Sequence, residues 1–253
     1  MKVQYASDLH IEFPENKAFL KANPLKPVGD ILVLAGDIVP FSVMHKHADF
    51  FNYLSDNFKN TYWIPGNHEY YRSDIIDRSE SLHEKIKNNV FLVNNRSVVV
   101  ENTKFIFSTL WTKIRPAYRW QIEQGMSDFH VIKYDGFRFS AEKYNLLHKK
   151  CLDFIQQELA GKKKRRTVVV THHAPTFLNY PEMYKGNALN DAFAVELFGL
   201  IESSQPGFWL YGHTHNNIPD FKIGKTRLLT NQLGYVMHNE QYGFMNDKII
   251  VTD

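Results

Sequence analysis

Side chains that can bind metal ions gather directly after five apolar runs of this 253-residue sequence. The runs are "KVQYA", "ILVLA", "TYWI", "TVVVT" and "GFWLY". The candidate ligands that follow them are Asp8, His10, Asp37, Asn67, His213, His215 and one of the adjacent pair His172 and His173. If the runs are strands of an α/β protein, these residues converge, because such proteins bind ligands at the carboxyl ends of their strands. We therefore expect one site built from five distant segments.

Two of these segments have a spacing that suits a shared ion. Side chains two residues apart in an extended chain point to the same side. Asp8 with His10, and His213 with His215, can therefore each bind one ion from one side. The neighbours at positions 172 and 173 point in different directions, so only one of them is expected to face the site, and periodicity does not say which.

The donor types indicate which metals the site would bind. Carboxylate, amide and imidazole groups without cysteine suit manganese, iron or zinc better than a structural cysteine-zinc site. Seven ligands are too many for one tetrahedral ion, whereas two ions that share a carboxylate would use all of them. Two metals roughly 3.5 to 4 Å apart are the usual device for hydrolysing phosphate esters. We expect two divalent ions, with manganese favoured and iron or zinc as alternatives.

Each residue taken singly has an ordinary structural explanation. An aspartate after a strand often caps a helix, so Asp8 or Asp37 alone would be assigned that role, and Asn67 after Gly66 alone would be a turn residue. An isolated histidine is usually a surface or hydrogen-bonded core residue. Five strand ends that all carry ligand-type residues are hard to explain as turns. The joint pattern therefore favours a metal site.

The elements that must position these residues alternate between short apolar runs and longer amphipathic stretches. Ten runs have the length and composition of strands: 2–6, 31–35, 61–64, 90–93, 97–100, 104–108, 167–171, 207–211, 227–230 and 248–251. Helices are expected near residues 45–58, 74–88, 141–160 and 190–203. Several strands follow one another with no helix between them, which favours two packed sheets over one open sheet.

Composition limits the class of protein and its partners. Hydrophobic residues make up 43% and charged residues 23% of the chain, as in an ordinary globular protein, and we expect one domain over residues 1–253. The net charge of +3 does not favour nucleic acid or an anionic membrane, and we interpret the basic run at 161–166 as a solvated helix end. The single cysteine, Cys151, cannot form an internal disulfide, and the N-terminus lacks an apolar leader. These features predict a cytoplasmic protein without a membrane partner.

The motifs resemble those of the calcineurin-like metallophosphoesterases. The pattern of that family runs D-x-H, G-D, G-N-H-[DE], a histidine after a strand, and G-H-x-H. It appears here in the same order as "DLH", "GD", "GNHE", "THHAP" and "GHTH", between residues 8 and 215. Glu69 in place of the commoner aspartate is within the variation of the family. The resemblance implies an α/β fold in which a two-sheet β-sandwich is flanked by helices, in agreement with the excess of strands.

The resemblance also implies a role for each residue. One metal is bound by Asp8, His10 and His215, the other by Asn67, His172 and His213, and Asp37 bridges the two. His173 is then only a neighbour of the ligand. His68 matches the histidine that protonates the leaving group or stabilises the transition state. A positioned acid beside the metals is worth about 10²- to 10⁴-fold in rate, because alkoxides leave poorly.

We therefore expect a phosphoric ester hydrolase that uses a metal-bridging hydroxide, prefers a phosphodiester and acts on a small-molecule phosphate ester. A phosphomonoesterase or protein phosphatase is the alternative, although Asp37 leads into "IVPF" without the arginine that follows the "GD" motif of protein phosphatases. A nuclease is not favoured, because the chain has no obvious long DNA-binding extension. A non-catalytic scaffold of the same fold is less favoured still, since all seven ligands are present.

Residues 110–139 are the candidate segment for substrate selection. They lack a clear strand or helix period yet are rich in Trp, Tyr, Phe and Arg, which predicts an ordered, loop-like insertion. Trp111, Arg115 and His130, together with Asn67, could stack on a base or contact a phosphate beside the metals. If the aromatic side chains only cover the sheet edge, the loop from Thr176 to Asn190 is the alternative.

Overall fold

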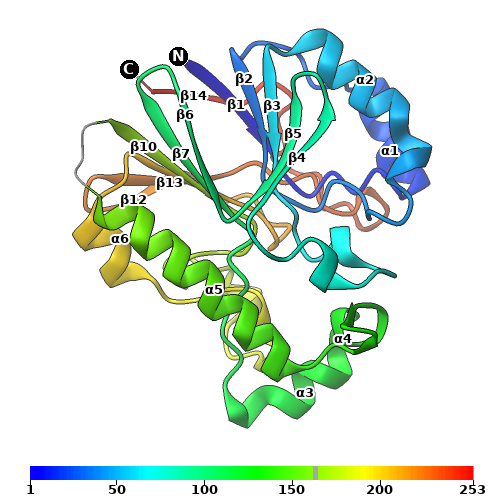
Figure 1. The fold of residues 1–253 in the computed structure, drawn as a ribbon, viewed down its shortest axis with the longest axis vertical. Helices are drawn as coiled ribbons and strands as arrows, with labels where there is room; N and C mark the ends of the chain where they lie inside the picture. The colour runs from blue at the N-terminus through cyan, green and yellow to red at the C-terminus, as the bar shows by residue number, and fades with distance from the viewer. Residues whose placement is uncertain (162–164, 253) are drawn as a thin grey trace.

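The computed structural model describes residues 1–161 and 165–252, and its long strands form two six-stranded sheets (Figure 1). The first sheet has the order β14 (Ile249–Val251), β1 (Lys2–Ala6), β2 (Ile31–Leu34), β3 (Asn60–Trp63), β5 (Val90–Asn94) and β4 (Leu82–Lys87). The second has the order β12 (Phe221–Ile223), β13 (Thr226–Thr230), β11 (Phe208–Tyr211), β10 (Arg166–Thr171), β7 (Thr103–Ser108) and β6 (Arg96–Val100). Residues 162–164 of the basic run lie outside the described residues.

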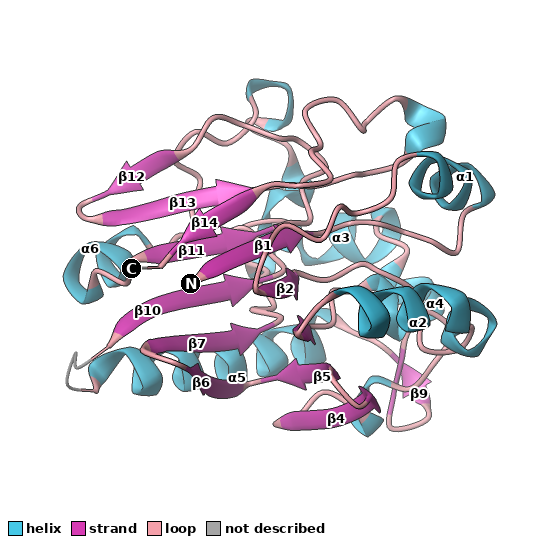
Figure 2. Cartoon of the chain, turned by 90° about the horizontal axis from the view of Figure 1, so that it is seen from above, coloured by secondary structure: helices cyan, strands magenta, loops and turns pink. Residues whose placement is uncertain are grey.

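The strand directions bring the carboxyl ends of both sheets to one end of the molecule. In each sheet four parallel strands lie between two antiparallel edge strands. Figure 2 shows β1, β7 and β10 pointing the same way, although β1 belongs to the other sheet. The loops after the parallel strands can therefore meet.

The space between the sheets is filled by apolar side chains from both. Tyr5 and Val33 of the first sheet pack with Phe107, Val168 and Val170 of the second in one buried cluster. The central strands are buried on both faces, which explains why they appear in the sequence as continuous apolar runs and not as alternating ones.

Helices cover the outer face of each sheet, as Figure 1 shows. The first sheet carries α1 (Pro14–Ala22) and α2 (Ala48–Asn57), and the second carries α5 (Ala141–Ala160) and α6 (Phe198–Ser204). This arrangement confirms the predicted α/β class and the two-sheet sandwich flanked by helices. None of the described helices is long and apolar enough to cross a membrane.

The remaining elements connect this framework. Short helices α3 (Arg119–Gly125) and α4 (Asp128–Val131) and the hairpin β8 (Lys133–Tyr134) and β9 (Phe137–Arg138) lie between β7 and α5. Single 3₁₀ turns span Met44–His47, His68–Tyr70, Ile75–Asp77, Pro116–Tyr118, Glu182–Tyr184, Ala188–Ala192 and Val236–His238. The prediction of a loop-like insertion at 110–139 is therefore wrong, because half-buried helices and a hairpin occupy much of it.

All ten predicted strands are present within one residue of their expected bounds, and α5 has the predicted bounds of 141–160. The helix predicted near 74–88 is wrong: β4 occupies Leu82–Lys87 as a half-exposed edge strand paired with β5. The helix predicted at 190–203 is two short pieces, the turn Ala188–Ala192 and α6. Helix α1 was not predicted, although Pro14 in its first turn is a typical start signal.

The packing between the sheets leads to a prediction about stability. Phe107 is fully buried there, so Phe107→Ala should lower the free energy of unfolding by about 3 to 5 kcal/mol. Val99 on the edge strand β6 is 49% exposed, and Val99→Ala should change stability by less than about 0.5 kcal/mol. Urea denaturation followed by circular dichroism measures both values. Similar losses in the two variants would contradict the packing described.

Candidate metal centre

The seven predicted ligands lie in the loops that follow five parallel strands, and both sheets contribute. The first sheet positions Asp8 and His10 after β1, Asp37 after β2 and Asn67 after β3, and the second positions His172 after β10 and His213 and His215 after β11. All of them are buried except His215, which is partly exposed. The sandwich therefore collects the predicted ligands at one end of the molecule.

A first group of ligand atoms forms around the end of β1. The donor atoms of Asp8, His10, Asp37 and His215 lie within 4.8 Å of one another. The Nε2 atoms of His10 and His215 are 3.1 Å apart, and the latter is 3.4 Å from Asp8 Oδ1. Imidazole nitrogens and a carboxylate oxygen thus face a common point, as ligands around a cation do.

A second group adjoins the first and shares a residue with it. His172 Nε2 lies 3.0 Å from His213 Nδ1 and 3.1 Å from Asn67 Oδ1. Asp37 Oδ2 is 3.4 Å from His172 Nε2 and 3.8 Å from His10 Nε2. The Asp37 carboxylate therefore lies between the two groups.

The chain fits closely around these carboxylates. A Cβ atom on Gly66 would lie 2.2 Å from Asp37 Oδ1, and one on Gly212 would lie 2.5 Å from Asp8 Oδ2. Only glycine allows the backbone to approach a ligand this closely. Together with the carboxylate, amide and imidazole donors, this cradle fits divalent ions of the manganese, iron or zinc type.

Backbone strain is concentrated at the same residues. Five ligands have a left-handed backbone although none is glycine: Asp8 (φ 55°), His10 (φ 46°), Asp37 (φ 55°), His213 (φ 71°) and His215 (φ 48°). Such conformations cost on the order of 1–3 kcal/mol each and persist where surrounding contacts enforce them. The contacts here join one ligand loop to the next: Asp8 N–H donates to Gly36 O (2.9 Å), and His213 N–H donates to Asp8 Oδ1 (3.0 Å).

Glu69 is a structural anchor of the site that the sequence interpretation treated only as a motif variant. Its fully buried carboxylate accepts four hydrogen bonds, from the backbone of Asp37 (2.9 Å), Ile38 (2.7 Å) and Gly66 (2.6 Å) and from Trp63 Nε1 (3.1 Å). These bonds tie the loop after β2 to the loop after β3. The only sequence signal for this role was the position of Glu69 directly after "GNH".

The electrostatic field of the site attracts cations. Burial lowers the pKa of His172, but the Asp37 carboxylate more than offsets this effect and raises it to about 9. Burial likewise lowers the pKa of His215, while hydrogen bonds to Asp8 and Glu240 raise it to about 10. In contrast, burial and the neighbouring His172 lower the pKa of His173 to about 3, in keeping with a structural role for that residue. The carboxylates thus stabilise positive charge on His172 and His215, whereas burial lowers the pKa values of His10 and His213.

His68 lies beside the two groups, where its ring is held from several sides. Nε2 is 3.1 Å from the Tyr235 hydroxyl, Nδ1 is 3.5 Å from Glu12 Oε1, and the ring stacks on Tyr71 at 4.0 Å. Burial lowers the pKa of His68, but Asp37 and Glu12 outweigh burial and raise it. A raised pKa favours the protonated form of the imidazole, and a protonated imidazole at this position would have the chemistry of a general acid.

The calcineurin-like phosphoesterase family model matches residues 1–217, which include every residue of both ligand groups. The chain belongs to this family. Uncharacterized protein L509 of Acanthamoeba polyphaga mimivirus is 32% identical over 260 residues, which cover 92% of this chain and 91% of that protein. Phosphopantetheinyl hydrolase of Mycobacterium tuberculosis has a similar fold, with a TM-score of 0.71 and 14% identity over 100% of this chain and 96% of that one. The family typically binds divalent metals, in agreement with the ligand groups described above.

The candidate metal centre opens into a hollow of about 340 Å³. Aromatic side chains form much of its wall: Tyr71, Tyr180, Tyr184, Phe193 and Tyr235. Among the described residues that line it, none is Lys or Arg. A ligand in the hollow would therefore meet aromatic rings, amides, imidazoles and the carboxylates of Asp37 and Glu240.

Of the four residues predicted to contact the substrate, Asn67 lines the hollow, and the other three lie outside it. Trp111 is 1% exposed in the core, so the prediction that it stacks on a substrate is wrong. Arg115 is paired with Asp191 (2.7 Å), His130 Nε2 faces Gln124 O (3.0 Å), and neither lines the hollow. The segment 110–139 reaches the hollow only through residues 125–127, whereas the alternative loop contributes Tyr180, Tyr184, Asn187, Leu189 and Asn190.

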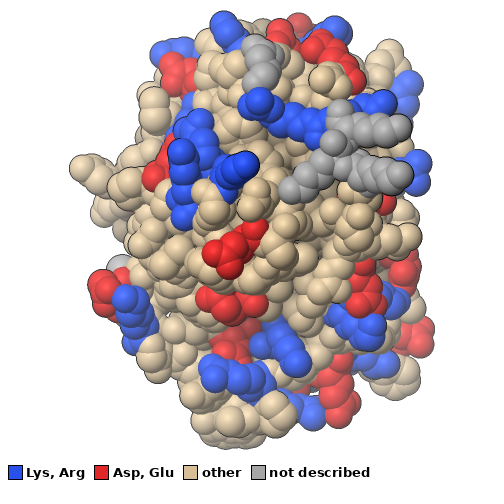
Figure 3. Space-filling model, turned by 90° about the vertical axis from the view of Figure 1, so that its left-hand side faces the viewer, with Lys and Arg blue, Asp and Glu red and all other residues tan. Residues whose placement is uncertain are grey.

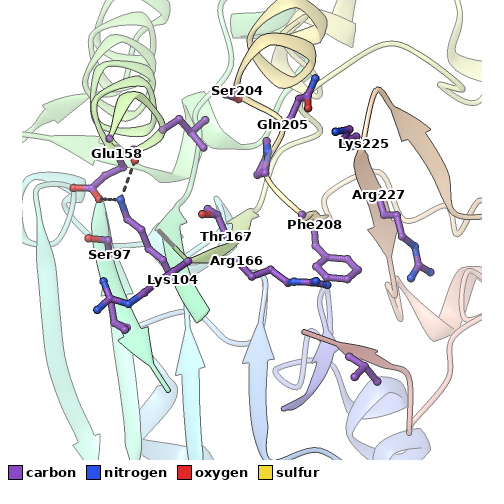
Figure 4. Close-up of a pocket in the computed structure, with 17 residues that line it drawn as sticks. Ser97, Lys104, Glu158, Arg166, Thr167, Ser204, Gln205, Phe208, Lys225 and Arg227 are labelled. Atoms are coloured by element: carbon purple, nitrogen blue, oxygen red, sulfur yellow. Dashed lines mark hydrogen bonds and ion pairs between the residues drawn. The ribbon is translucent and has the colours of Figure 1, made fainter. Parts of the chain in front are cut away.

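A larger hollow, of about 730 Å³, lies where the parallel strands of the second sheet begin, at the opposite end of these strands from the candidate ligands (Figure 4). Its cationic side chains include Lys104, Arg166 and Arg227, and Lys104 is neutralised by Glu158 at 2.7 Å. Figure 3, which looks at the left-hand side of Figure 1, shows Lys and Arg side chains in both halves of this face, with Asp and Glu side chains among them. Within the described part of the chain, none of the groups of metal-binding side chains lies in this hollow.

Loss of ligands should have unequal effects on metal content. Asp37→Ala should lose both ions, whereas Asp8→Ala should retain the ion of the second group, because only Asp37 lies between the groups. Wild type purified without chelator should carry about two ions per chain. Elemental mass spectrometry after dialysis gives these contents. Equal retention in the two variants would contradict a shared carboxylate.

Proposed function

We propose that this phosphoesterase is a binuclear metal enzyme that hydrolyses a small phosphodiester, with manganese as its metal. The strongest support is the pair of ligand groups that share Asp37 beside His68 at the base of the hollow. Metal ions bound there would activate water and stabilise charge on the attacking and leaving oxygens. A hollow of about 340 Å³ suits a small molecule better than a polymer.

His68 is the residue that would deliver a proton to the leaving oxygen. Glu12 lies at Nδ1, and the other nitrogen, Nε2, faces the hydroxyl of Tyr235, a residue that lines the hollow. The Tyr235 hydroxyl, 3.1 Å from Nε2, shows that an oxygen can occupy hydrogen-bond distance from that nitrogen. Asp37 and Glu12 raise the pKa of His68 against the effect of burial, which favours the protonated imidazole that a general acid requires.

The charges of the hollow favour a diester over a monoester. A phosphomonoester carries two charges near neutral pH, and enzymes that bind such groups usually present an arginine fork. The described lining of the hollow has no Lys or Arg, and Asp37 is followed by "IVPF". A diester carries one charge less, and its second substituent can pack on Tyr180, Tyr184 and Phe193.

The substrate preference can be measured directly. With manganese bound, kcat/KM for bis(4-nitrophenyl) phosphate should exceed that for 4-nitrophenyl phosphate by about tenfold or more, equivalent to about 1.4 kcal/mol. Both substrates release the same nitrophenolate, so the comparison isolates the charge and the second substituent. A preference for the monoester would replace the proposal with the phosphomonoesterase alternative.

The role of His68 can be tested by varying the leaving group. His68→Ala should reduce kcat/KM about 10²- to 10⁴-fold on alkyl phosphodiesters, and far less on nitrophenyl diesters, whose leaving group needs little protonation. Its metal content should match wild type, because His68 belongs to neither of the two ligand groups that share Asp37. The matched control is His130→Ala, which removes an imidazole outside the hollow. Equal losses of His68→Ala on both substrate types would exclude proton donation.

A further inference from the structure

Asp128, the first residue of α4, reaches the metal centre from a segment that carries none of its ligands. The side chain is 1% exposed and lies beside the loop after β3. Its Oδ1 accepts a hydrogen bond from Asn67 Nδ2 at 2.9 Å and another from the Tyr71 hydroxyl at 2.8 Å. One carboxylate oxygen thus contacts a metal ligand and the tyrosine that stacks on His68.

The contact with Asn67 decides which end of its amide faces the metal. An asparagine side chain has an oxygen end and a nitrogen end of nearly the same shape, and only the oxygen has a lone pair to offer a cation. Asn67 Oδ1 lies 3.1 Å from His172 Nε2, within the second ligand group. Rotating the amide by half a turn would present the NH₂ group there. A carboxylate can only accept a hydrogen bond, so Asp128 stabilises the orientation with Nδ2 toward itself.

The second contact extends this effect to His68. The Tyr71 ring lies 4.0 Å from the His68 ring, nearly parallel to it, and both side chains line the hollow. Because the Tyr71 hydroxyl bonds to the same Oδ1 atom, Asp128 fixes the surface on which the imidazole packs. The segment 110–139 therefore acts on the site through Asp128, which contacts Asn67 directly and His68 through Tyr71.

We propose that Asp128 is a positioning residue that holds the Asn67 amide with its oxygen toward the second ligand group. This inference rests on the proposed binuclear function. It gives residues 110–139 a role in metal binding in place of the substrate contacts predicted for Trp111, Arg115 and His130. Residues that orient ligands in this way are commonly worth about 10- to 100-fold in metal affinity.

The first test compares Asp128→Ala with Asp128→Asn by manganese titration calorimetry. Asp128→Ala should weaken one of the two binding events about 10- to 100-fold and leave the other unchanged. Asp128→Asn retains an acceptor oxygen and should restore most of the lost affinity. Tyr71→Phe is the matched control: it removes the other partner of Asp128 and only a long contact (3.5 Å) with Asn67 Nδ2. It keeps the 2.9 Å hydrogen bond between Asn67 and Asp128, so both ions should still bind. Equal affinities in Asp128→Ala and wild type would overturn the proposal.

The second test uses Asn67→Asp, which offers an oxygen whichever way the group rotates. In the single variant, which keeps Asp128, the new carboxylate faces the Asp128 carboxylate, and manganese binding should weaken. In the Asp128→Ala background the same change should strengthen it, because orientation no longer matters. An effect of the same sign in both backgrounds would contradict the proposal.

A third combination keeps the proposal testable if Asp128→Ala fails to fold. Asn67→Asp with Asp128→Asn exchanges the two groups, and the amide at 128 can donate to the carboxylate at 67. This double variant should bind the second ion more tightly than Asn67→Asp alone, and no gain would count against the proposal. Wild type that binds fewer than two ions would instead refute the binuclear function itself.

Discussion

The Asp37 carboxylate is buried where the two sheets meet, and the site is arranged around its charge. One oxygen accepts the His68 backbone N–H at 2.9 Å, and the other lies within 4 Å of imidazoles from both sheets. An uncompensated buried carboxylate costs several kcal/mol, so the fold must supply positive charge or a cation beside it. The surrounding histidines meet this requirement, and the same atoms are suited to hold metal ions.

The rest of the fold can be understood as the support for that arrangement. Two sheets with parallel central strands end at the same place, so short loops suffice to bring the ligands together. The left-handed backbone of five ligands shows that the loops are strained, and hydrogen bonds such as those of Glu69 offset the strain. Asp128 adds a further constraint from outside the sheets. The strained loops thus lower the stability of the fold locally, and they hold the ligands in a fixed geometry.

The sequence predicts the features that have a local pattern, such as buried strands. It does not predict the features that depend on how distant segments pack. Buried parallel strands are continuous apolar runs, so all ten predicted strands are present, and ligand types after strand ends identified the residues that converge. The sequence predicts a helix at the edge strand β4, because the alternating, half-exposed residues of this strand give no continuous apolar run. Trp111 could not be placed, because its aromatic side chain suits a core as well as a binding surface. The contact between Asp128 and Asn67 joins residues 61 positions apart and has no sequence signature.

The central claim is that two metal ions lie on either side of Asp37, and anomalous diffraction from manganese-loaded crystals tests it most directly. We expect two anomalous peaks roughly 3.5 to 4 Å apart. One should lie among Asp8, His10 and His215, and the other among Asn67, His172 and His213, with Asp37 between them. The crystals should be grown from enzyme that is active on a diester. A single peak, or two peaks that do not share Asp37, would contradict the account.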